Sequence, residues 1–570
     1  MAGRRTRTDS MSNVDTAWLR MEERNNLMMI TGVMTFDAPL DVTRVKQVLR
    51  ERFLTYERFT QRVVAPALPG QNPRWQTDPN FNLDNHVRIF RLPPPGDKDM
   101  LQRLVSHLMS TPLDLTRPPW EFHLVLNVEG HGSAVIPRLH HSIADGIALV
   151  SVMLYMTDPT PNPPPRPAEP GPSRGGGNPV TGLFKPLTNT VRGAQKAAGT
   201  VLHAGVDALI HPSHVIKAAR LGGSTAITVG KLALMPADPP TLFKGPLGNE
   251  KRAAWTELIP LPDVKAVGKA MNGTVNDVLL TAVAGALRRY LIEHEQTIED
   301  LNIRAVIPVN LRPLDVKPKL GNQFGLVFLS LPLGIEDPVD RVEELKRRMD
   351  DIKDSPEAVV TFGLLNAAGM MPEDVQDTLI DIFGTKATAV MTNVPGPRQT
   401  IYLAGLPIRE LVFWVPQSGK VGLGVSILSY DERVVVGFAT DAGLLPDPDA
   451  LARDFEREFS EMMLLVEEVR QAEEWDKKLE ALEEEAARPA TARTYTTVES
   501  DLTSGLEDPM PSGVTPLGEV TSPAAITPSP PTANGAAHLP TGACHAVTKS
   551  GAPCRNRALP GAAYCRVHQP

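Results

Sequence analysis

Two adjacent histidines, followed by an aspartate and a glycine, are the side chains in this sequence best suited to acid–base chemistry. His140 and His141 lie in the segment RLHHSIADG, and Asp145 and Gly146 follow four and five residues after His141. A neutral imidazole accepts a proton from a hydroxyl group near pH 7, which contributes roughly 10²–10⁴-fold to a rate. A helix that begins at this point would turn its positive end toward the histidines and help to keep one neutral and basic. The segment is therefore a candidate site for a general base.

The same residues also have a purely structural interpretation. Asp145 can cap the helix that follows it, and Gly146 permits a tight turn from the loop into that helix. Two histidines at the end of a strand can be ordinary strand residues with no catalytic part. The surrounding sequence has to decide between the two interpretations.

Strand-like and helix-like patterns alternate around the motif and would position it. Residues 27–36 form a continuous apolar run typical of a buried strand, and residues 41–53 carry apolar residues at helical spacing. The strands predicted at 121–128 and 133–141 are joined by the turn sequence EGHG, and a helix is predicted at 146–156. This mixture predicts an α/β domain with the histidine pair between a strand end and a helix start.

Length, composition and charge restrict the classes of function. A chain of 570 residues, 42% of them hydrophobic, predicts two or more globular domains. The net charge of −8 gives no electrostatic reason to expect a nucleic-acid partner. No run of about eighteen apolar residues predicts a transmembrane helix, and no apolar segment of a secretory signal follows the basic N-terminus. The three cysteines all lie in the last thirty residues, so a disulfide framework is excluded for the main body and a reducing, intracellular setting fits.

Changes in composition divide the chain into segments. We expect two α/β lobes joined by a Pro/Gly-rich linker and helical connector, then an acidic helix in solvent, a disordered Ser/Thr/Pro-rich stretch and a small cysteine-bearing module. In order, these segments are residues 11–158 (first lobe), 159–250 (linker and connector), 251–471 (second lobe), 472–489 (acidic helix), 490–539 (disordered) and 540–570 (module).

The motif and the segments around it resemble one family. HHSIADG resembles the HHxxxDG signature of the CoA-dependent acyltransferase superfamily. RPPWEFHLV, TVNDVLL, RAVIPVNLRP, LGNQFG and TNVPGP resemble, in the same order, segments of the bacterial wax ester synthase/diacylglycerol acyltransferases. The resemblance covers about residues 12 to 469, and one departure from it is Pro119 at the second position of the PLWE element.

The resemblance implies a fold and a mechanism. The fold would be two similar chloramphenicol-acetyltransferase-like α/β lobes with an interlobe channel, in which acyl-CoA and the acceptor meet from opposite faces. His141 would deprotonate the hydroxyl of a diacylglycerol or a long-chain alcohol, and the oxygen would attack the thioester directly, with no acyl-enzyme, metal or other cofactor. His140 would support the motif loop, and Asp145 would hold that loop by an ion pair.

Three further residues are candidates for roles in the site. Asn276, at the start of a predicted helix, could donate a hydrogen bond to the oxyanion, an interaction worth about 2.7–4 kcal/mol. It could equally be the N-cap of that helix, or serve as both. Trp120 and Glu121 could line the acyl path together with Gly146, although a buried tryptophan in a strand is more often part of the core.

Apolar substrates predict an enzyme that visits a membrane or lipid-droplet surface without spanning it. The apolar residues 181–235, interspersed with lysine and arginine, are the candidate contact surface. The alternative is that these helices pack over the two lobes. We therefore expect a cytoplasmic, peripherally associated protein whose partners are acyl-CoA and diacylglycerol or fatty alcohol, and not nucleic acid.

The C-terminal segment contains four residues that are candidate ligands of a structural zinc ion. Cys544, Cys554, Cys565 and His568 have the spacing Cys-x9-Cys-x10-Cys-x2-His, and His545 is an alternative ligand. Four nitrogen and sulfur ligands suit tetrahedral zinc, which would supply the folding energy that so short a segment lacks. The alternative is a disordered tail with free thiols.

Two other functions remain open on the sequence. An amide-forming condensation domain would be expected beside carrier or adenylation domains, and none is apparent. A catalytically inactive lipid-binding or scaffold protein would be favoured by loss of a motif histidine or aspartate, and these residues are present.

Overall fold

The computed structural model describes residues 8–66, 68, 71–163, 224–311, 320–353, 355–371, 373–417 and 419–487. Most of the predicted linker, the predicted disordered stretch and the proposed zinc ligands Cys544, Cys554, Cys565 and His568 lie outside these residues, as does 181–223 of the candidate membrane-contact surface.

The first lobe is built on a five-stranded sheet that carries the histidine motif. Its strands run in the order β15-β2-β7-β6-β5, antiparallel except for the parallel pair β5 and β6. Their bounds are β2 (Met29–Phe36), β5 (Val87–Arg91), β6 (Trp120–Val128), β7 (Gly132–His140) and β15 (Glu410–Trp414), and the lobe's helices are α2 (Val42–Glu51), α3 (Lys98–Met109) and α4 (Gly146–Met156). β7 is buried along its whole length, as expected for a central strand rich in apolar residues.

The second lobe contains a seven-stranded mixed sheet. Six strands follow the order β11-β10-β12-β16-β17-β8, and β9 pairs separately with β17. The bounds are β8 (Lys251–Trp255), β9 (Ile259–Pro260), β10 (Asn302–Asn310), β11 (Phe324–Pro332), β12 (Ala389–Pro395), β16 (Leu423–Tyr430) and β17 (Arg433–Asp441). Its helices are α8 (Ser224–Leu234), α9 (Leu261–Ala270), α10 (Val275–Glu293), α11 (Pro338–Lys353), α12 (Glu357–Ala368), α13 (Glu373–Thr385) and α14 (Pro448–Ala487).

Local sequence explains why the principal helices begin where they do. The side chain of Asp41 caps α2 by accepting hydrogen bonds from the Thr43 and Arg44 amides. Thr274 and Asp277 form a reciprocal capping box at the start of α10. α10 then packs against α9, α11 and α14, and its apolar residues form the centre of the second core.

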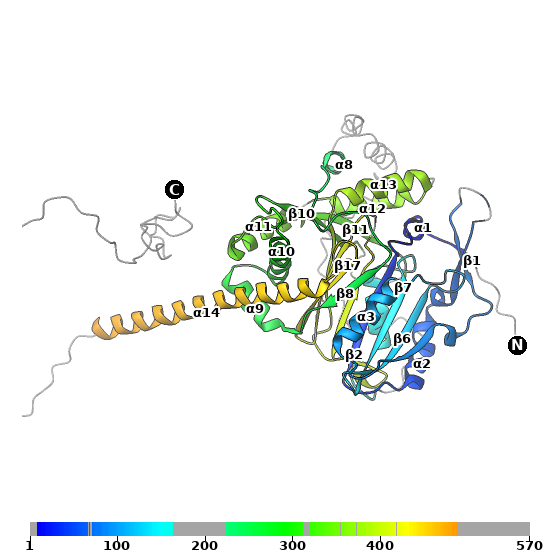
Figure 1. Ribbon diagram of the computed structural model, residues 1–570, viewed down its shortest axis with the longest axis horizontal. Coiled ribbons are helices and arrows are strands. Elements are labelled where there is room, and N and C mark those ends of the chain that lie inside the picture. Colours follow the sequence, from blue (N-terminus) through cyan, green and yellow to red (C-terminus); the bar gives the residue numbers. More distant parts are fainter. Residues whose placement is uncertain are drawn as a thin grey trace, which may run out of the picture. The chain divides into compact units, whose positions relative to one another are not determined.

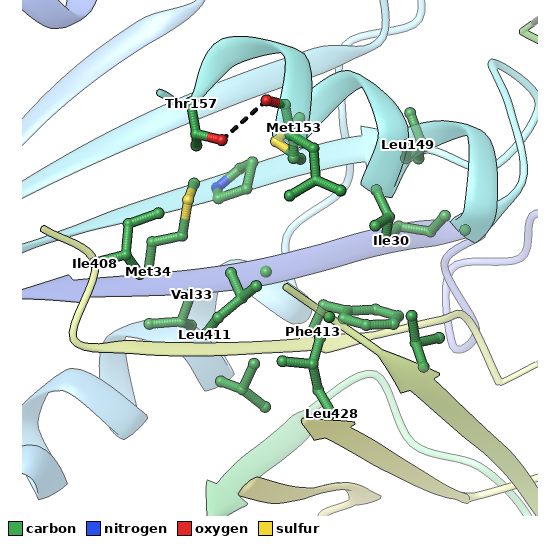
Figure 2. Close-up of a pocket in the computed structure, with 18 of the residues that line it drawn as sticks. Ile30, Val33, Met34, Leu149, Met153, Thr157, Ile408, Leu411, Phe413 and Leu428 are labelled. Carbon is green, nitrogen blue, oxygen red and sulfur yellow. Dashed lines mark hydrogen bonds between the residues drawn. The ribbon is translucent and has the colours of Figure 1, made fainter. Parts of the chain in front are cut away.

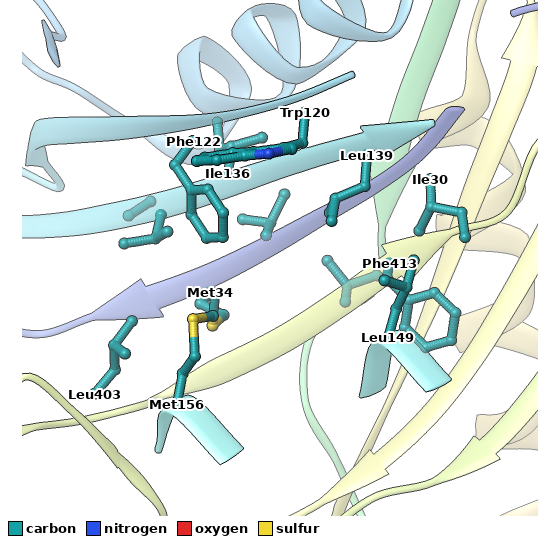
Figure 3. Close-up of a cluster of buried hydrophobic side chains, with 14 of the residues drawn as sticks. Ile30, Met34, Trp120, Phe122, Ile136, Leu139, Leu149, Met156, Leu403 and Phe413 are labelled. Carbon is teal, nitrogen blue, oxygen red and sulfur yellow. The ribbon is translucent and has the colours of Figure 1, made fainter. Parts of the chain in front are cut away.

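Two segments cross between the lobes. β15 comes from the second half of the chain but pairs with β2, so that Leu411 lies opposite Met34 and Phe413 lies opposite Gly32. α1 (Asn13–Arg20), near the N-terminus, packs against α12 in the second half (Figure 1). The core of the first lobe therefore mixes residues from both halves, as the side chains in Figure 3 show.

The remaining described elements are small. β1 (Thr8–Ser10), β4 (Arg74–Thr77) and β3 (Gln61–Val64) form a three-stranded sheet, and β13 (Tyr402–Leu403) pairs with β14 (Leu406–Pro407). Short 3-10 turns lie at η1 (Phe53–Thr55), η2 (Glu57–Thr60) and η3 (Leu83–Asn85). Among the helices of the described residues, none combines the length and the apolar character that a membrane span requires.

The two-lobe α/β architecture expected from the resemblance is confirmed. The strands and helices predicted around the motif appear within a few residues of their expected ends. β15 did not stand out in the sequence, because its five residues ELVFW follow no alternating pattern. It nevertheless supplies part of the wall around the motif.

Candidate active site

The motif occupies the loop between β7 and α4, and backbone contacts fix its shape. The amide of His141 donates to the carbonyl of Met28 (2.8 Å), and the amide of Ile143 donates to the carbonyl of His140 (3.0 Å). Asp145 caps α4 through a hydrogen bond from the Ala148 amide (2.9 Å). Its other carboxylate oxygen accepts from the Gln323 amide (2.9 Å), so the loop is also tied to the second lobe.

The His141 side chain is enclosed by aromatic rings. Its imidazole stacks on the indole of Trp18 with ring centroids 4.2 Å apart, and Phe324 lies edge-on at 5.7 Å. The residue is 4% exposed. Burial lowers its pKa to about 4, while the negative charge of Asp145 acts in the opposite direction. The sequence predicts that the helix terminus helps to keep this histidine neutral, and in the structure the first cause of its low pKa is the loss of water around the ring.

His140 is fully buried and contacts groups that hold the loop. Its Nδ1 lies 2.7 Å from the hydroxyl oxygen of Ser142 and accepts from the Ser142 amide (3.1 Å). Its Nε2 lies 2.9 Å from a carboxylate oxygen of Glu22, which also accepts from the Met28 amide. The carbonyl of Met28 accepts a hydrogen bond from the His141 amide. The contacts of His140 and Glu22 therefore stabilise the backbone that holds His141.

A pocket opens beside His141, which we call the His141 pocket. It has a volume of about 760 Å³, part of it open to solvent. Its lining includes His141, Asp145 and Gly146 from the motif, with Trp18, Asn393 and Phe413 from distant segments. The pocket thus brings a buried imidazole, a carboxylate and an amide side chain to one largely apolar space.

An almost wholly apolar cavity, the α4 pocket, adjoins it and is lined by residues of both lobes (Figure 2). It has a volume of about 770 Å³, again partly open, and its walls include Ile30, Met34, Leu149, Met153, Leu411 and Leu428. Gly146, Val394 and Phe413 line both this pocket and the His141 pocket. The two spaces therefore meet at the start of α4.

A second apolar cavity, the α12 pocket, adjoins the His141 pocket in the second lobe. It has a volume of about 740 Å³, and its walls include Met21, Leu364, Ala368, Ile380 and Phe383. Trp18, Val306 and Leu326 line both this cavity and the His141 pocket. The His141 pocket thus shares lining residues with two apolar cavities, the α4 pocket and the α12 pocket.

Trp120 and Glu121 lie outside all three of these pockets. Trp120 is buried in the core of the first lobe, where its indole nitrogen donates to the Phe59 carbonyl (2.8 Å). The carboxylate of Glu121 binds Arg138 (3.0 Å) on the neighbouring strand β7. The structure therefore places both residues in packing and ion-pair contacts of the sheet.

Asn276 lies at the edge of the site and not in its lining. Its side-chain oxygen accepts a hydrogen bond from the side-chain nitrogen of Asn393 (2.7 Å). Asn393 itself lines the His141 pocket. The alternative that Asn276 caps its helix is wrong, because the N-cap of α10 is Thr274. Asn276 is instead positioned to orient Asn393.

Gly146 contributes space and not an unusual backbone angle. Its φ is not in the left-handed region, and a Cβ at this position would meet no atom within 4 Å. The expected need for glycine in a tight turn is therefore not observed. The missing side chain instead leaves open the place where the His141 and α4 pockets meet.

The sequence did not single out four residues that contact or line the site: Trp18, Asn322, Phe324 and Phe413. Asn322 and Phe324 lie in LGNQFG, a segment with polar residues beside an apolar strand, which is the one local signal that could have identified them. Trp18 and Phe413 carry no such signal. Within the described residues there is no group of three or more histidine, cysteine or carboxylate side chains that could hold a metal ion.

Comparisons with known proteins show which proteins this chain resembles in sequence and fold. Residues 11–279 match the sequence model of the wax ester synthase/diacylglycerol acyltransferase catalytic domain, and residues 320–463 match that of the WS/DGAT C-terminal domain. Two Mycobacterium tuberculosis proteins described as diacylglycerol O-acyltransferases are similar. One is 27% identical over 477 residues (80% of this chain, 90% of the relative), and the other is 29% identical over 469 residues (80% and 92%). The solved wax ester synthase/diacylglycerol acyltransferase from Marinobacter aquaeolei VT8 has the same fold, with a TM-score of 0.58 at 22% identity over 80% of this chain and 99% of that chain.

Proposed function

Because the chain belongs to the wax ester synthase/diacylglycerol acyltransferase family of acyl-CoA-dependent O-acyltransferases, we propose that it esterifies a diacylglycerol or a long-chain alcohol, with His141 as the general base. The observation that carries this proposal is the place of His141, a buried neutral imidazole between two apolar cavities. An apolar chain on each side would bring a thioester and a hydroxyl together at this ring.

The proposed reaction needs one residue that takes up a proton and then releases it, and no covalent enzyme intermediate. The unprotonated nitrogen of His141 takes the proton of the acceptor hydroxyl while the oxygen attacks the thioester carbonyl. A carbon–oxygen bond forms, the tetrahedral intermediate collapses with cleavage of the carbon–sulfur bond, and the proton passes from His141 to the CoA thiolate. The charge of Asp145 raises the pKa of His141 and would stabilise the imidazolium between these steps.

The oxyanion would be stabilised by the Asn276–Asn393 pair. Asn393 uses one amide hydrogen to bind Asn276, which leaves the other free to point into the His141 pocket. A positioned donor of this kind acts on charge that develops only in the transition state. Asn276 would thus contribute by fixing the orientation of Asn393.

The two cavities would bind the two chains. Burial of each methylene group contributes about 0.8 kcal/mol, so two apolar cavities favour a long-chain acyl donor and a long-chain acceptor over small alcohols. We propose that the α4 pocket holds one chain and the α12 pocket the other.

Such substrates would reach the enzyme from a lipid surface. Within the candidate contact segment, the described helix α8 exposes Ile227 and Leu234 while Leu232 is buried. Exposed apolar side chains beside Lys231 suit a peripheral contact with a cytoplasmic membrane face or lipid droplet. Binding of the full chain to lipid vesicles, compared with an Ile227→Asp/Leu234→Asp variant, tests this part.

The decisive experiment measures CoA release and ester formation by the full chain with palmitoyl-CoA, offering dioleoylglycerol and hexadecanol separately. We expect ester from at least one acceptor and its loss in His141→Ala, with unchanged circular dichroism. Turnover of an amine acceptor alone would favour the condensation-type reaction. A folded wild-type chain with no His141-dependent transfer to any acceptor would favour the inactive lipid-binding protein.

A further inference from the structure

The last part of α14 carries an exposed apolar stripe. The helix joins the second core as far as Met462, which is the last buried side chain among those described on it. Every described side chain from residue 468 to residue 483 is exposed, and in Figure 1 this part of α14, in orange, extends past the other helices of the second lobe. Trp475, Leu479 and Leu482 are nevertheless large and apolar, and they are 67%, 52% and 62% exposed.

These three side chains repeat with the spacing of a coiled-coil seam. Leu479 follows Trp475 by four residues, Leu482 follows Leu479 by three, and Ala472 and Ala486 continue the pattern on either side. Alternating steps of three and four place residues at the a and d positions of a heptad, on one line along the helix. A single exposed leucine needs no partner, whereas an apolar line on an otherwise charged helix is typical of an interface.

The charges beside this seam favour a second copy of the chain as the partner. With Leu479 at position a, Lys478 occupies position g and Glu483 occupies the next position e. In a parallel pair of helices, g of one helix faces the following e of the other, so Lys478 would face Glu483 of the second copy on both sides. The preceding g and e positions hold Gln471 and Asp476. Neither pair brings like charges together.

An antiparallel pair is less favourable. In that arrangement e faces e and g faces g, because the two helices run in opposite directions. Lys478 would then face Glu485 of the second copy, but Asp476 would face Glu483. One attraction and one repulsion of exposed charges roughly cancel. The charges therefore select the parallel arrangement.

Both members of the parallel pair are available for such a contact. Lys478 and Glu483 are exposed, and neither has an ion pair with another of the residues that the structure describes. The ammonium group of Lys478 lies over the ring of Trp475, 5.7 Å from its centroid. This contact is compatible with a dimer, because the side chain at g covers the neighbouring d residue of its own helix.

We propose that residues 472–486 of α14 form a parallel two-stranded coiled coil with the same segment of a second copy, so that the chain dimerises reversibly. Isolated helices of this length are marginal in water, but this one continues a helix that the second core already holds. The seam is short, so we expect micromolar affinity. None of its residues lines the three pockets, so changes to the seam should not alter the pH dependence of acyl transfer.

Sedimentation velocity of the full chain at increasing concentration tests the dimer. We expect the wild type to shift from monomer to dimer and Leu479→Asp/Leu482→Asp to remain monomeric, because each helix would bring two unpaired charges into the seam. Ile292→Asp is the matched control, since Ile292 is 48% exposed on α10 and lies outside the seam. This control should dimerise like the wild type. Circular dichroism should be the same for all three proteins, because only exposed side chains change.

An exchange of charges tests the parallel arrangement. Lys478→Glu and Glu483→Lys each turn two attractive pairs into two repulsive ones, so each should raise the Kd of the dimer about tenfold. The double variant Lys478→Glu/Glu483→Lys restores opposite charges, and its Kd should return to within about threefold of the wild-type value. In an antiparallel pair, Glu483→Lys would instead face Asp476 and lower the Kd.

A wild-type chain that stays monomeric up to about 100 μM would overturn the inference. A dimer that survives Leu479→Asp/Leu482→Asp would show that a different surface associates, and would overturn it as well. Single charge variants with the wild-type Kd, or a lower Kd for Glu483→Lys, would refute the parallel coiled coil. None of these measurements depends on turnover, so the proposed function is tested separately.

Discussion

The indole of Trp18 stacks on the imidazole of His141, with ring centroids 4.2 Å apart and planes inclined by 29°. Trp18 also lines the α12 pocket and the His141 pocket. One side chain therefore both excludes water from the base and forms the wall between the base and an apolar cavity. The low pKa of His141 follows from this enclosure.

Activity should persist to unusually low pH and should depend on Trp18. Because the pKa of His141 is about 4, the acid limb of kcat/KM is expected near pH 4 and not near 6.5. Trp18→Ala admits water, raises the pKa of His141 and moves the limb to higher pH. Trp475→Ala is the control, because that residue is 67% exposed on α14. If kcat/KM of the wild type already falls on the acid side near pH 6.5, the prediction is wrong.

The free energy of unfolding should depend on pH because the pKa of His141 is low in the folded chain. The folded chain keeps His141 neutral down to about pH 4, whereas the unfolded chain binds a proton near 6.5. The unfolded state therefore binds more protons between these values, and stability falls as pH falls from 6.5 to 4, by about 3 kcal/mol from this residue. Denaturant unfolding of wild type and His141→Gln at pH 7 and pH 4.5 checks this. The difference between the two proteins should shift with pH, and parallel changes would refute the assignment.

Gly146 should control acyl or acceptor chain length without affecting stability. Gly146→Ala fits because a Cβ meets nothing and the backbone is helical, so it should keep the wild-type melting temperature and near-wild-type activity. Gly146→Leu places a bulky group where the α4 and His141 pockets meet. We expect its kcat/KM for palmitoyl-CoA or hexadecanol to fall about tenfold or more relative to an eight-carbon analogue. Equal losses for long and short chains would show that the junction is not the passage.

Asn393 should matter more to catalysis than Asn276. Asn393→Ala removes the amide that lines the pocket, and the loss of an oxyanion donor typically lowers kcat about 10²–10³-fold. Asn276→Ala leaves that amide in place but unoriented, so its effect should be smaller. Steady-state kcat for the two variants and the double variant distinguishes the roles. If the kcat of Asn276→Ala is as low as that of the double variant while Asn393→Ala stays active, Asn276 is the oxyanion donor and the assignment to Asn393 is wrong.

Sequence patterns determined the parts of this protein that depend on near neighbours along the chain. The strand before His141 and the helix after Asp145 follow from continuous apolar runs and a capping residue, which act over a few residues. The resemblance of HHSIADG to a known family motif identified the candidate base, because that motif is a short continuous segment. The core alternative for Trp120 was also available from its place in an apolar strand, and the structure shows that residue in the core.

Tertiary structure decided how the base is enclosed and what surrounds it. Trp18, Asn322 and Phe413 are separated from His141 by many residues, and they reach the site only through α1, the loop before β11 and the crossing strand β15. No local pattern records such approaches, because they depend on where whole elements pack. The pKa of His141 also depends on tertiary structure, because its desolvation comes from the residues packed around the ring and not from the motif.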